Sequence, residues 1–497
     1  MPENAATFSL PELGVGIIYS SEIEPLLVQY PGLFDVVEVE PQTIWLENRN
    51  GPAPYRILND VLEHIAQLPG RKLVHSIGTP VGGTRRPDPG QLALLRRTLE
   101  RFGAPWFSDH LSFNATPEFN TGFFLPPRQT AKGVETAVQS IRDLQMALPL
   151  PIAVETGVNY LKPRRDEMPD GLFIAAVAET ANCGILLDLH NIFANSLNGR
   201  QTMEEFLAQI PLDRVWEMHI AGGFEMDGFW LDAHSGAIPD HLLAFARQVI
   251  PNLPNLKAII FEIFSAYVPV AGLELIKTQM AKLRELWRRR GQPQPHGLIL
   301  NPSRYQMPGR TEQVESPAAW ERALGALAIG HSSTEPLANQ LTHDPGVAII
   351  NRLVNEFRAA MIVSTLRLAS RLLMLALGVD KFRARLEDFW SKIPPQQFAS
   401  SEAEKFAAYL KQLDLPLPQL AEILDFEQAV LATLIDEQPR VVKFDMDPLP
   451  MIRALAEGRL PEIQGQIGHF EIEVTPDGPM SATGLDLESV RQAFPFH

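Results

Sequence analysis

The sequence predicts an α/β protein, a (β/α)₈ barrel of the TIM type followed by a smaller, mainly helical α+β domain. Three observations predict this. Eight short apolar, β-branched runs recur within the first 290 residues, with helix-like segments between them. The pattern changes near residue 291, where Pro, Gly and polar residues accumulate. The chain of 497 residues is 45% hydrophobic and 21% charged, which is typical of a globular protein that buries a core.

The expected barrel strands are runs of five to seven residues dominated by Val, Ile, Leu and Phe. They are GVGIIYS (14–20), VVEVE (36–40), KLVHSI (72–77), WFSDHL (106–111), PIAVET (151–156), GILLDLH (184–190), RVWEMHI (214–220) and AIIFEIF (258–264). A doubly wound open sheet is the competing arrangement, but the first run is not followed by a glycine-rich phosphate turn. We therefore expect the closed barrel.

The segments between these runs have helical character. The clearest are 89–103, 129–148 and 272–291. The last ends in consecutive Arg residues and a Gly, which suits a helix C-terminus. We expect the barrel to span residues 1–291.

Residues 292–317 are rich in Pro, Gly and polar side chains and are expected to form a linker. Residues 318–497 are expected to form a separate α+β domain. Its helical part runs from about 318 to 437, including the stretch 346–378, and strand candidates at 440–447 and 468–475 follow around a helix near 448–458. We find no internal repeat.

The net charge and the cysteine content exclude several classes of partner and site. The net charge of −16 argues against nucleic acid, because phosphate backbones bind basic faces. The single Cys183 excludes an internal disulfide framework and a Cys-rich zinc site. The N-terminus lacks a basic start and an apolar h-region, so we expect a cytoplasmic protein. Arg367 and Arg371 interrupt the apolar stretch 359–378, which favours a buried or amphipathic helix over a membrane span.

Metal-competent side chains stand at the ends of six expected strands. These are His75, His110, Glu155, Asp188, His219 and Glu262; Asn191 follows Asp188, and Asp232 and His234 lie in the seventh strand–helix loop. In a (β/α)₈ barrel all strand ends meet at one mouth, so we expect these residues to converge. Taken singly, each His is more simply a hydrogen-bonded structural residue, each Glu a member of a salt bridge, and Asn191 a loop cap.

Together they favour a multinuclear metal site, because burying four carboxylates and four imidazoles without cations would be prohibitively costly. Imidazole and carboxylate ligands without thiolates suit Fe, Zn or Mn. The spacing suggests His75, His110 and Glu155 for one ion, with Glu155 bridging. Asp188, His219 and Glu262 would complete a second site, and Asn191, Asp232 and His234 a weaker third.

The strings VHSIG, FSDHLSFN, IAVETG, ILLDLHNIFANSLN, MHIAGG, WLDAHSG and FEIF, in this order, resemble the multinuclear non-heme iron-dependent oxidative enzymes (MNIO) over roughly residues 12–290. The resemblance implies a (β/α)₈ barrel that modifies cysteines of ribosomally synthesised precursor peptides in natural-product biosynthesis. It also implies two or three iron ions in mixed Fe(II)/Fe(III) states, with O₂ as co-substrate. The implied metal ligands are His75, His110, Glu155, Asp188, His219, Asp232, His234 and Glu262.

Two further residues are candidates for catalysis, Asp109 beside His110 and Asn191. His190 is expected to point away from Asp188 at an extended strand end. The sequence departs from the family pattern at Thr156, where Asn is usual, and in the stretches after His75 and around Glu38.

The C-terminal segments SKIPPQQFASSEAEKFAAYLKQLDLPLPQLAEILDFEQAV and RVVKFDMDPLPMIRALAEGRLP resemble, more faintly, the small partner proteins of these oxidases, here fused to the enzyme. This implies recognition of the precursor peptide, for which an exposed strand edge is the expected mode. An oligomerisation or purely structural domain is the alternative.

Three other functions stay open. Endonuclease IV-like trinuclear zinc hydrolases share the barrel and a similar ligand order, although the net charge disfavours a DNA substrate; sugar isomerases of similar shape rely more on carboxylates. A scaffold that binds metal or peptide without catalysis is the non-enzyme alternative.

Overall fold

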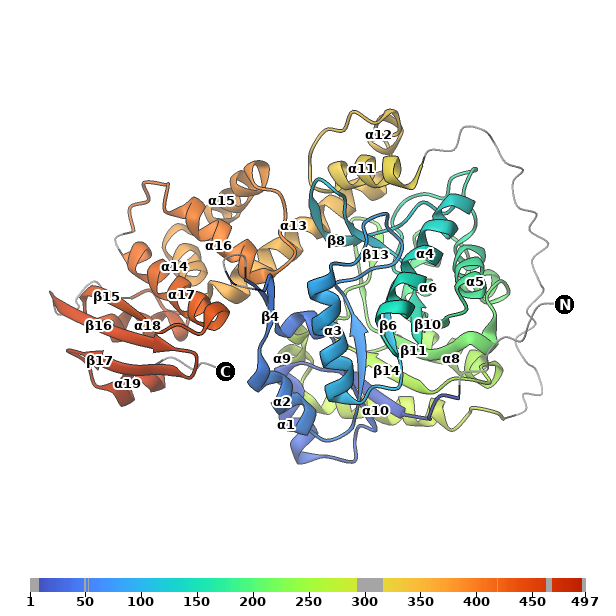
Figure 1. Ribbon diagram of the computed structural model, residues 1–497, viewed down its shortest axis with the longest axis horizontal. Helices are drawn as coiled ribbons and strands as arrows, with labels where there is room; N and C mark the ends of the chain where they lie inside the picture. The colour runs from blue at the N-terminus through green and yellow to red at the C-terminus, as the bar shows by residue number, and fades with distance from the viewer. Residues whose placement is uncertain are drawn as a thin grey trace. The chain divides into compact units, whose positions relative to one another are not determined.

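The computed structural model describes residues 9–48, 51, 53–292, 316–417, 419–461 and 467–493 (Figure 1). The chain forms two compact units. Unit 1 comprises Met1–Ile44, Asn59–Glu118 and Phe123–Asn351, and unit 2 comprises Trp45–Leu58, Phe119–Gly122 and Arg352–His497. Unit 2 therefore includes two short segments that lie, in sequence, within the predicted barrel region.

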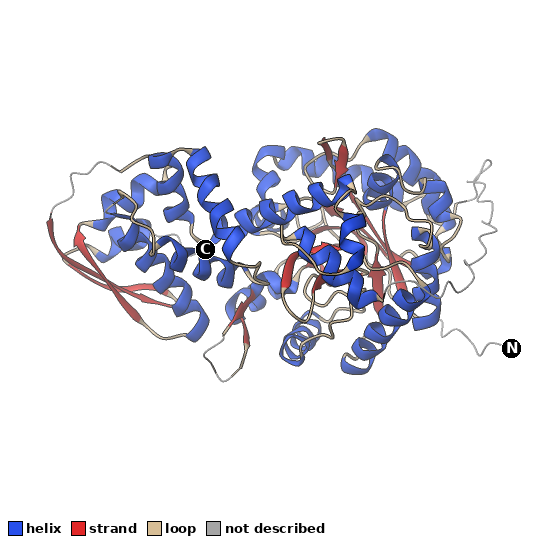
Figure 2. Ribbon diagram, turned by 90° about the horizontal axis from the view of Figure 1, so that it is seen from above, coloured by secondary structure: helices blue, strands red, loops and turns tan. Residues whose placement is uncertain are grey.

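Unit 1 contains a closed barrel of eight parallel strands, which confirms the predicted fold class. Neighbouring strands follow the order β1 (Gly14–Ile18), β14 (Ala258–Glu262), β11 (Val215–Ala221), β10 (Gly184–Asp188), β9 (Ile152–Glu155), β6 (Phe107–His110), β5 (Arg71–Ser76) and β2 (Val36–Val39). All eight strands fall within the eight apolar runs, apart from shifts of one residue at two strand ends. Figure 2 shows these strands in red with helices around them.

The helices that follow the strands form the outer layer. They are α1 (Glu24–Gln29), α2 (Asn59–Gln67), α3 (Pro89–Phe102), α4 (Ala131–Ala147), α5 (Asp170–Ala181), α6 (Leu189–Leu197), α7 (Met203–Leu207), α8 (Asp240–Val249), α9 (Val268–Ala271) and α10 (Leu273–Trp287). Local sequence sets their ends. Asp88 caps α3 by accepting from the backbone N–H groups of Gly90 and Gln91, and Gly103 ends it in the left-handed region at φ 62°.

The barrel interior away from the carboxyl ends of the strands is filled with apolar side chains. The cluster consists of Leu13, Val36, Leu73, Trp106, Ala153, Leu186, Trp216, Ala258 and Ile260. Because strand side chains alternate between faces, residues two positions beyond an inward-facing apolar residue also point inward, nearer the carboxyl ends. Apolar side chains therefore fill the barrel away from the mouth, which is the end formed by the carboxyl ends of the strands. A functional site inside the barrel is expected at the mouth.

Loops at the mouth carry two short hairpins, β7 (Phe113–Ala115) with β8 (Asn120–Leu125), and β12 (Phe224–Met226) with β13 (Phe229–Leu231). Helices α11 (Pro317–Ala328) and α12 (Pro336–Leu341) also belong to unit 1. The Trp320 indole N–H donates to the Pro126 carbonyl at 2.8 Å, and Glu321 accepts from the Thr84 backbone N–H at 2.9 Å.

These contacts group residues 317–351 with the barrel, whereas we expected the second domain to begin at 318. The division falls inside α13 (Pro345–Thr365), between Asn351 and Arg352. Most of the expected linker, residues 293–315, lies outside the described residues.

Unit 2 combines helices with a three-stranded antiparallel sheet. Its helices are α14 (Arg367–Leu377), α15 (Val379–Lys392), α16 (Ala399–Leu410), α17 (Gln419–Asp436), α18 (Pro448–Ala456) and α19 (Leu487–Ala493). The sheet order is β15 (Arg440–Met446), β16 (Ile467–Thr475) and β17 (Gly478–Thr483), and a separate hairpin joins β3 (Trp45–Glu47) to β4 (Tyr55–Ile57). The strands predicted at 440–447 and 468–475 match β15 and β16.

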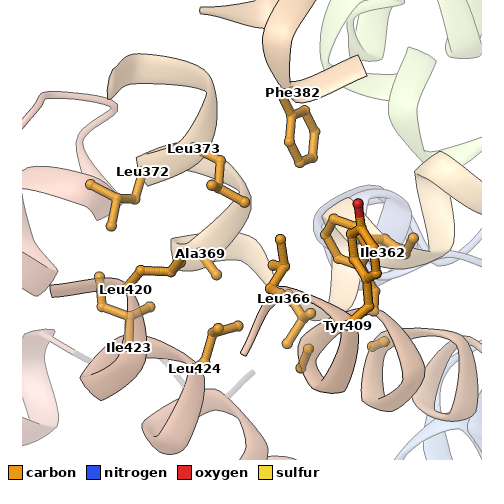
Figure 3. Packing of buried hydrophobic residues seen from close by; sticks show 14 of the residues in the cluster. Ile362, Leu366, Ala369, Leu372, Leu373, Phe382, Tyr409, Leu420, Ile423 and Leu424 are labelled. Atoms are coloured by element: carbon orange, nitrogen blue, oxygen red, sulfur yellow. The ribbon is translucent and has the colours of Figure 1, made fainter. Parts of the chain in front are cut away.

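The helical core of unit 2 packs around Leu366, where α13 and α14 meet (Figure 3). Figure 3 shows Ile362, Leu366 and Ala369 facing Tyr409 and the α17 residues Leu420 and Leu424. The predicted helical stretch 346–378 is thus broken in two, with a bend of 109°.

No single helix in the described part of the chain is long and apolar enough to cross a membrane, although α13 and α14 together meet the length and composition test as a bent pair.

A candidate metal centre at the barrel mouth

Six strands place metal-competent side chains inside the barrel at their carboxyl ends. Four of these side chains stand two positions after an inward-facing residue of the apolar core. They are His75 after Leu73, Glu155 after Ala153, Asp188 after Leu186, and Glu262 after Ile260. His110 on β6 and His219 on β11 complete the set, and Asp232 and His234 follow β13. All eight predicted ligands gather at the mouth as expected.

The first group consists of His75, His110 and Glu155. Glu155 Oε2 lies 3.4 Å from Nε2 of His75 and 3.4 Å from Nε2 of His110. The other nitrogen of His75, Nδ1, lies 2.9 Å from the Ser108 hydroxyl, which fixes the ring orientation. Three ligand atoms from neighbouring strands therefore converge on one point.

Two further groups share residues with their neighbours. One contains Glu155, Asp188 and His219, and the other contains Asp188, His234 and Glu262. Glu155 and Asp188 each belong to two groups, which suits carboxylates that bridge two ions. Asp188 also caps α6, because Oδ1 accepts from the backbone N–H groups of His190 and Asn191, and Oδ2 is left for the site.

Beside Asp232 and His234 the structure places His190. Asn191, which was expected in this third grouping, donates its side-chain amide to Glu155. His190 stands in the first turn of α6 rather than at an extended strand end, and this turns its ring toward Asp232, with Nδ1 3.1 Å from Oδ1. The Trp230 indole donates to His190 Nε2 at 3.0 Å, so both ring nitrogens of His190 are engaged.

The two candidate catalytic residues have different surroundings. Asn191 donates through Nδ2 to Glu155 Oε1 at 3.0 Å and to the Thr156 carbonyl at 3.3 Å, so it orients a residue shared by two groups. Asp109 is fully buried and accepts from the Thr79 hydroxyl at 2.5 Å and from the His110 backbone N–H at 2.7 Å. Its carboxylate comes no closer than 3.9 Å to the His110 imidazole.

Many of the buried polar atoms here have no hydrogen-bond partner. They include both ring nitrogens of His219 and of His234, Oε2 of Glu155, Oδ2 of Asp188 and Oε2 of Glu262. Leaving such an atom unpaired costs about 1–3 kcal/mol. Within the described part of the chain, every ion-pair partner of the site carboxylates is a histidine. The donor set therefore fits divalent first-row metal ions, which would satisfy the unpaired lone pairs.

The mutual proximity also perturbs the pKa values. Burial raises the pKa of Asp188 to about 6, and the nearby carboxylates of Glu262 and Asp232 add to the shift. Burial lowers the pKa of His75 well below its usual value, and the neighbouring imidazoles reinforce this. For His234, burial is outweighed by the carboxylates of Asp232 and Glu262, so that its pKa rises to about 10. Such shifts mark groups crowded into one desolvated site.

The backbone and two aromatic rings complete the mouth. His234 has φ 43°, a left-handed conformation that a non-glycine residue adopts only when its surroundings impose it. Phe124 stacks on the His110 ring at a centroid distance of 3.9 Å, and Phe264 lies 4.5 Å from the His234 ring. Phe264 is 46% exposed.

Sequence reasoning missed three further acids. Glu38 and Glu217 are fully buried around His219, and Glu40 lies just beyond the end of β2, two positions after Glu38. Burial raises the pKa of Glu40 to about 7, with Glu262 contributing. The signal was present, since an acid in an apolar run at period two from another inward residue faces the interior.

Several solved structures align with part of this chain at low identity and low TM-score. A xylose isomerase domain protein from Alicyclobacillus acidocaldarius is 19% identical with a TM-score of 0.35 and covers 56% of this chain and 99% of its own. Endonuclease IV from Thermus thermophilus is 13% identical with a TM-score of 0.34 and covers 56% of this chain and 99% of its own.

Closer relatives are bacterial UPF0276 proteins. The protein from Chromobacterium violaceum is 31% identical over 228 residues, which are 45% of this chain and 81% of that protein. The protein from Streptomyces avermitilis is 29% identical over 242 residues, 47% of this chain, and the match spans only 48% of that relative's length.

Residues 14–284, more than half of the chain, match the model of a family described as the RiPP precursor modification enzyme MbnB/TglH/ChrH. The matched range covers all eight barrel strands and every member of the metal-competent groups. This chain belongs to that family of RiPP precursor modification enzymes.

Proposed function

We propose that the protein is a multinuclear iron, O₂-dependent oxidase that modifies cysteine residues of a ribosomally synthesised precursor peptide. The observation that supports it best is the set of overlapping His and carboxylate groups at the barrel mouth. Buried ring nitrogens and carboxylate oxygens of this set lack hydrogen-bond partners. Among the described residues, the carboxylates of the set form ion pairs only with histidines. Family membership supports a precursor peptide as the substrate.

The residues that would hold the ions are His75, His110, Glu155, Asp188, His219, Asp232, His234 and Glu262. Bound iron would supply one-electron redox chemistry toward O₂ and a site for the cysteine thiolate. The imidazole-rich, thiolate-free donor set suits iron in either oxidation state, although zinc and manganese suit it as well.

The chain itself supplies orientation and exclusion of water. Ser108, Asn191 and His190 each hold a ligand, namely His75, Glu155 and Asp232. Asp109 ties the start of the following loop to Thr79 and so fixes the backbone at His110. Phe124 and Phe264 cover two of the imidazoles, which limits the access of water to the reacting sulfur.

Unit 2 would recognise the precursor peptide. In the strand order β15–β16–β17, the outer strands pair on one side only among the described residues, so a peptide can add as a further strand. Hydrogen exchange of the full chain with and without the peptide tests this, since strand addition should protect amides of β15 or β17. A scrambled peptide is the control, and protection confined to helical surfaces would contradict it.

The function is tested by metal analysis of protein purified anaerobically without added ions, followed by reaction with iron, O₂ and a cysteine-bearing peptide encoded beside the gene. We expect two or three bound iron ions per chain and an O₂-dependent mass change in the peptide that vanishes in its Cys→Ala variant. Zinc-dependent phosphodiester cleavage without O₂ consumption would establish a hydrolase instead. Metal binding without any reaction would leave a scaffold.

A further inference from the structure

Beneath the metal centre lies a second polar group that the proposed chemistry does not use. It consists of Glu38 on β2 and Glu217 on β11, placed around His219. All three side chains are 0% exposed. Strands β14 and β1 separate β11 from β2 in the barrel order, so Glu38 reaches His219 through the barrel interior rather than from a neighbouring strand.

His219 has a carboxylate at each ring nitrogen. Nδ1 lies 3.0 Å from Glu262 Oε1, on the side of the metal-competent groups. Nε2 lies 2.8 Å from Glu38 Oε2 and 3.7 Å from Glu217 Oε1. A neutral imidazole carries one N–H and one lone pair, and a metal needs the lone pair. An N–H on Nε2, directed at Glu38, would leave the lone pair of Nδ1 for a metal, beside the candidate ligand Glu262.

The second acid, Glu217, is held by a hydrogen bond of its own. The Trp106 indole N–H donates to Glu217 Oε2 at 3.0 Å, which holds Glu217 beside the same imidazole. Within the described residues, neither Glu38 nor Glu217 has a Lys or Arg partner, and both Glu38 oxygens lack a hydrogen bond of good geometry. A buried carboxyl without a cation is costly, so its retention needs a compensating partner, and His219 is the one present.

We propose that Glu38, supported by Glu217, is a positioning residue that fixes the orientation and tautomer of His219 and so presents its Nδ1 to the metal centre. This inference rests on the proposed metal centre. It assigns a role to a part of the sequence that departs from the family pattern. Carboxylates that orient a metal-binding imidazole commonly change metal affinity about 10- to 100-fold when removed.

The test uses the full chain, with Glu38→Met to remove the acceptor at similar volume and Glu38→Gln to keep a carbonyl acceptor. Anaerobic chelator competition with Fe(II) measures affinity, and elemental analysis gives the ions bound per chain. We expect Glu38→Met to bind Fe(II) about 10- to 100-fold more weakly, and Glu38→Gln to retain most of the affinity. Glu321→Gln, a buried carboxyl of α11 outside the site, is the matched control and should bind as the wild type does.

Thermal unfolding of the metal-free proteins separates this from loss of the fold. If Glu38→Met does not fold, the number of ions bound per chain by Glu38→Gln still tests the inference. Wild-type affinity in Glu38→Met would overturn the inference while leaving the metal centre intact. Loss of one whole ion in Glu38→Gln would also overturn it, because Glu38 would then be a ligand. A wild-type protein that binds no metal would refute the proposed function itself.

Discussion

At the residue scale, the candidate metal centre depends on the side chains that orient its candidate metal ligands as well as on those ligands. Asn191 illustrates this, since its amide donates both to Glu155 and to the carbonyl of Thr156. Glu155 belongs to two of the candidate metal groups, so a change in its orientation should affect both. A residue that looks like a loop cap in the sequence therefore orients a carboxylate of the candidate metal centre.

Replacing Asn191 by Leu should lower Fe(II) affinity about 10-fold or more, because Glu155 loses the donor that orients it. Asn195 is one turn further along α6, where its side chain bonds to backbone groups of Gly157 and Asn159, so Asn195→Leu is the matched control. It should reduce thermal stability without weakening metal binding. Equal losses of affinity in both variants would mean that only the helix position matters.

Unit 2 contains a buried carboxylate paired with an arginine, whereas the carboxylates of the candidate metal centre pair only with histidines among the described residues. Arg358 and Glu402 are 1% and 0% exposed and lie 2.6 Å apart, and each also bonds to backbone near residues 393–396. Arg358→Met should cost about 3–5 kcal/mol of unfolding free energy because Glu402 is left buried and unpaired. The double variant Arg358→Met/Glu402→Met should recover much of this loss in chemical denaturation. A double variant no more stable than the single one would contradict this account.

At the element scale, the break between α13 and α14 shows how distant residues set a helix boundary. Glu427 on α17 accepts from the backbone N–H groups of Leu368 at 2.7 Å and Ala369 at 3.0 Å, and so satisfies donors exposed by the break. Burial raises the pKa of Glu427 to about 7, although these two hydrogen bonds oppose the shift. The carboxyl therefore holds its proton more tightly in the folded state than in the unfolded chain.

This shift gives a pH dependence of defined sign. A raised carboxyl pKa contributes stability that is fully present below the unfolded value near 4.5 and is lost as the pH rises through 7. The stability advantage of the wild type over Glu427→Gln should therefore shrink between pH 5 and 8, by up to about 3 kcal/mol. Calorimetry of both proteins across this range measures it, with the exposed Glu457→Gln as control. An advantage that grows with pH would reverse the sign and refute the assignment.

Features that depend on residues close in sequence could be predicted from the sequence, whereas features that depend on contacts between distant residues could not. The eight barrel strands were predictable because each is a local apolar run, and six of the candidate ligands because each stands at the end of such a run. The break at Leu366 was not, since it depends on Glu427, about 60 residues away in sequence. Nor was the contact of Glu38 with His219, because only closure of the barrel brings β2 and β11 to one imidazole. His190 was misplaced because Asp188 starts a helix at once.

At the scale of the whole molecule, the second unit is not a simple C-terminal addition. Residues 45–58, between barrel strand β2 and helix α2, belong to it as the β3–β4 hairpin. Within unit 2 the Tyr55 ring lies 5.7 Å from that of Phe398, Ser401 donates to Glu47, and Arg56 donates to the Leu434 carbonyl at 2.5 Å. The hairpin thus satisfies a carbonyl in the last turn of α17, which the sheet strand β15 closely follows.

Replacing Arg56 by Ala in the full chain should therefore loosen unit 2 although the residue lies in the first eighth of the sequence. We expect faster hydrogen exchange of amides in the last turns of α17 and in β15, because the Leu434 carbonyl and Glu437 lose their partner. Amides of barrel strands β9 and β10 should exchange at the wild-type rate. Arg97→Ala, at an exposed position on α3, is the control and should change neither region. Unchanged exchange in α17, or equal acceleration in the barrel, would show that the hairpin does not stabilise the second unit.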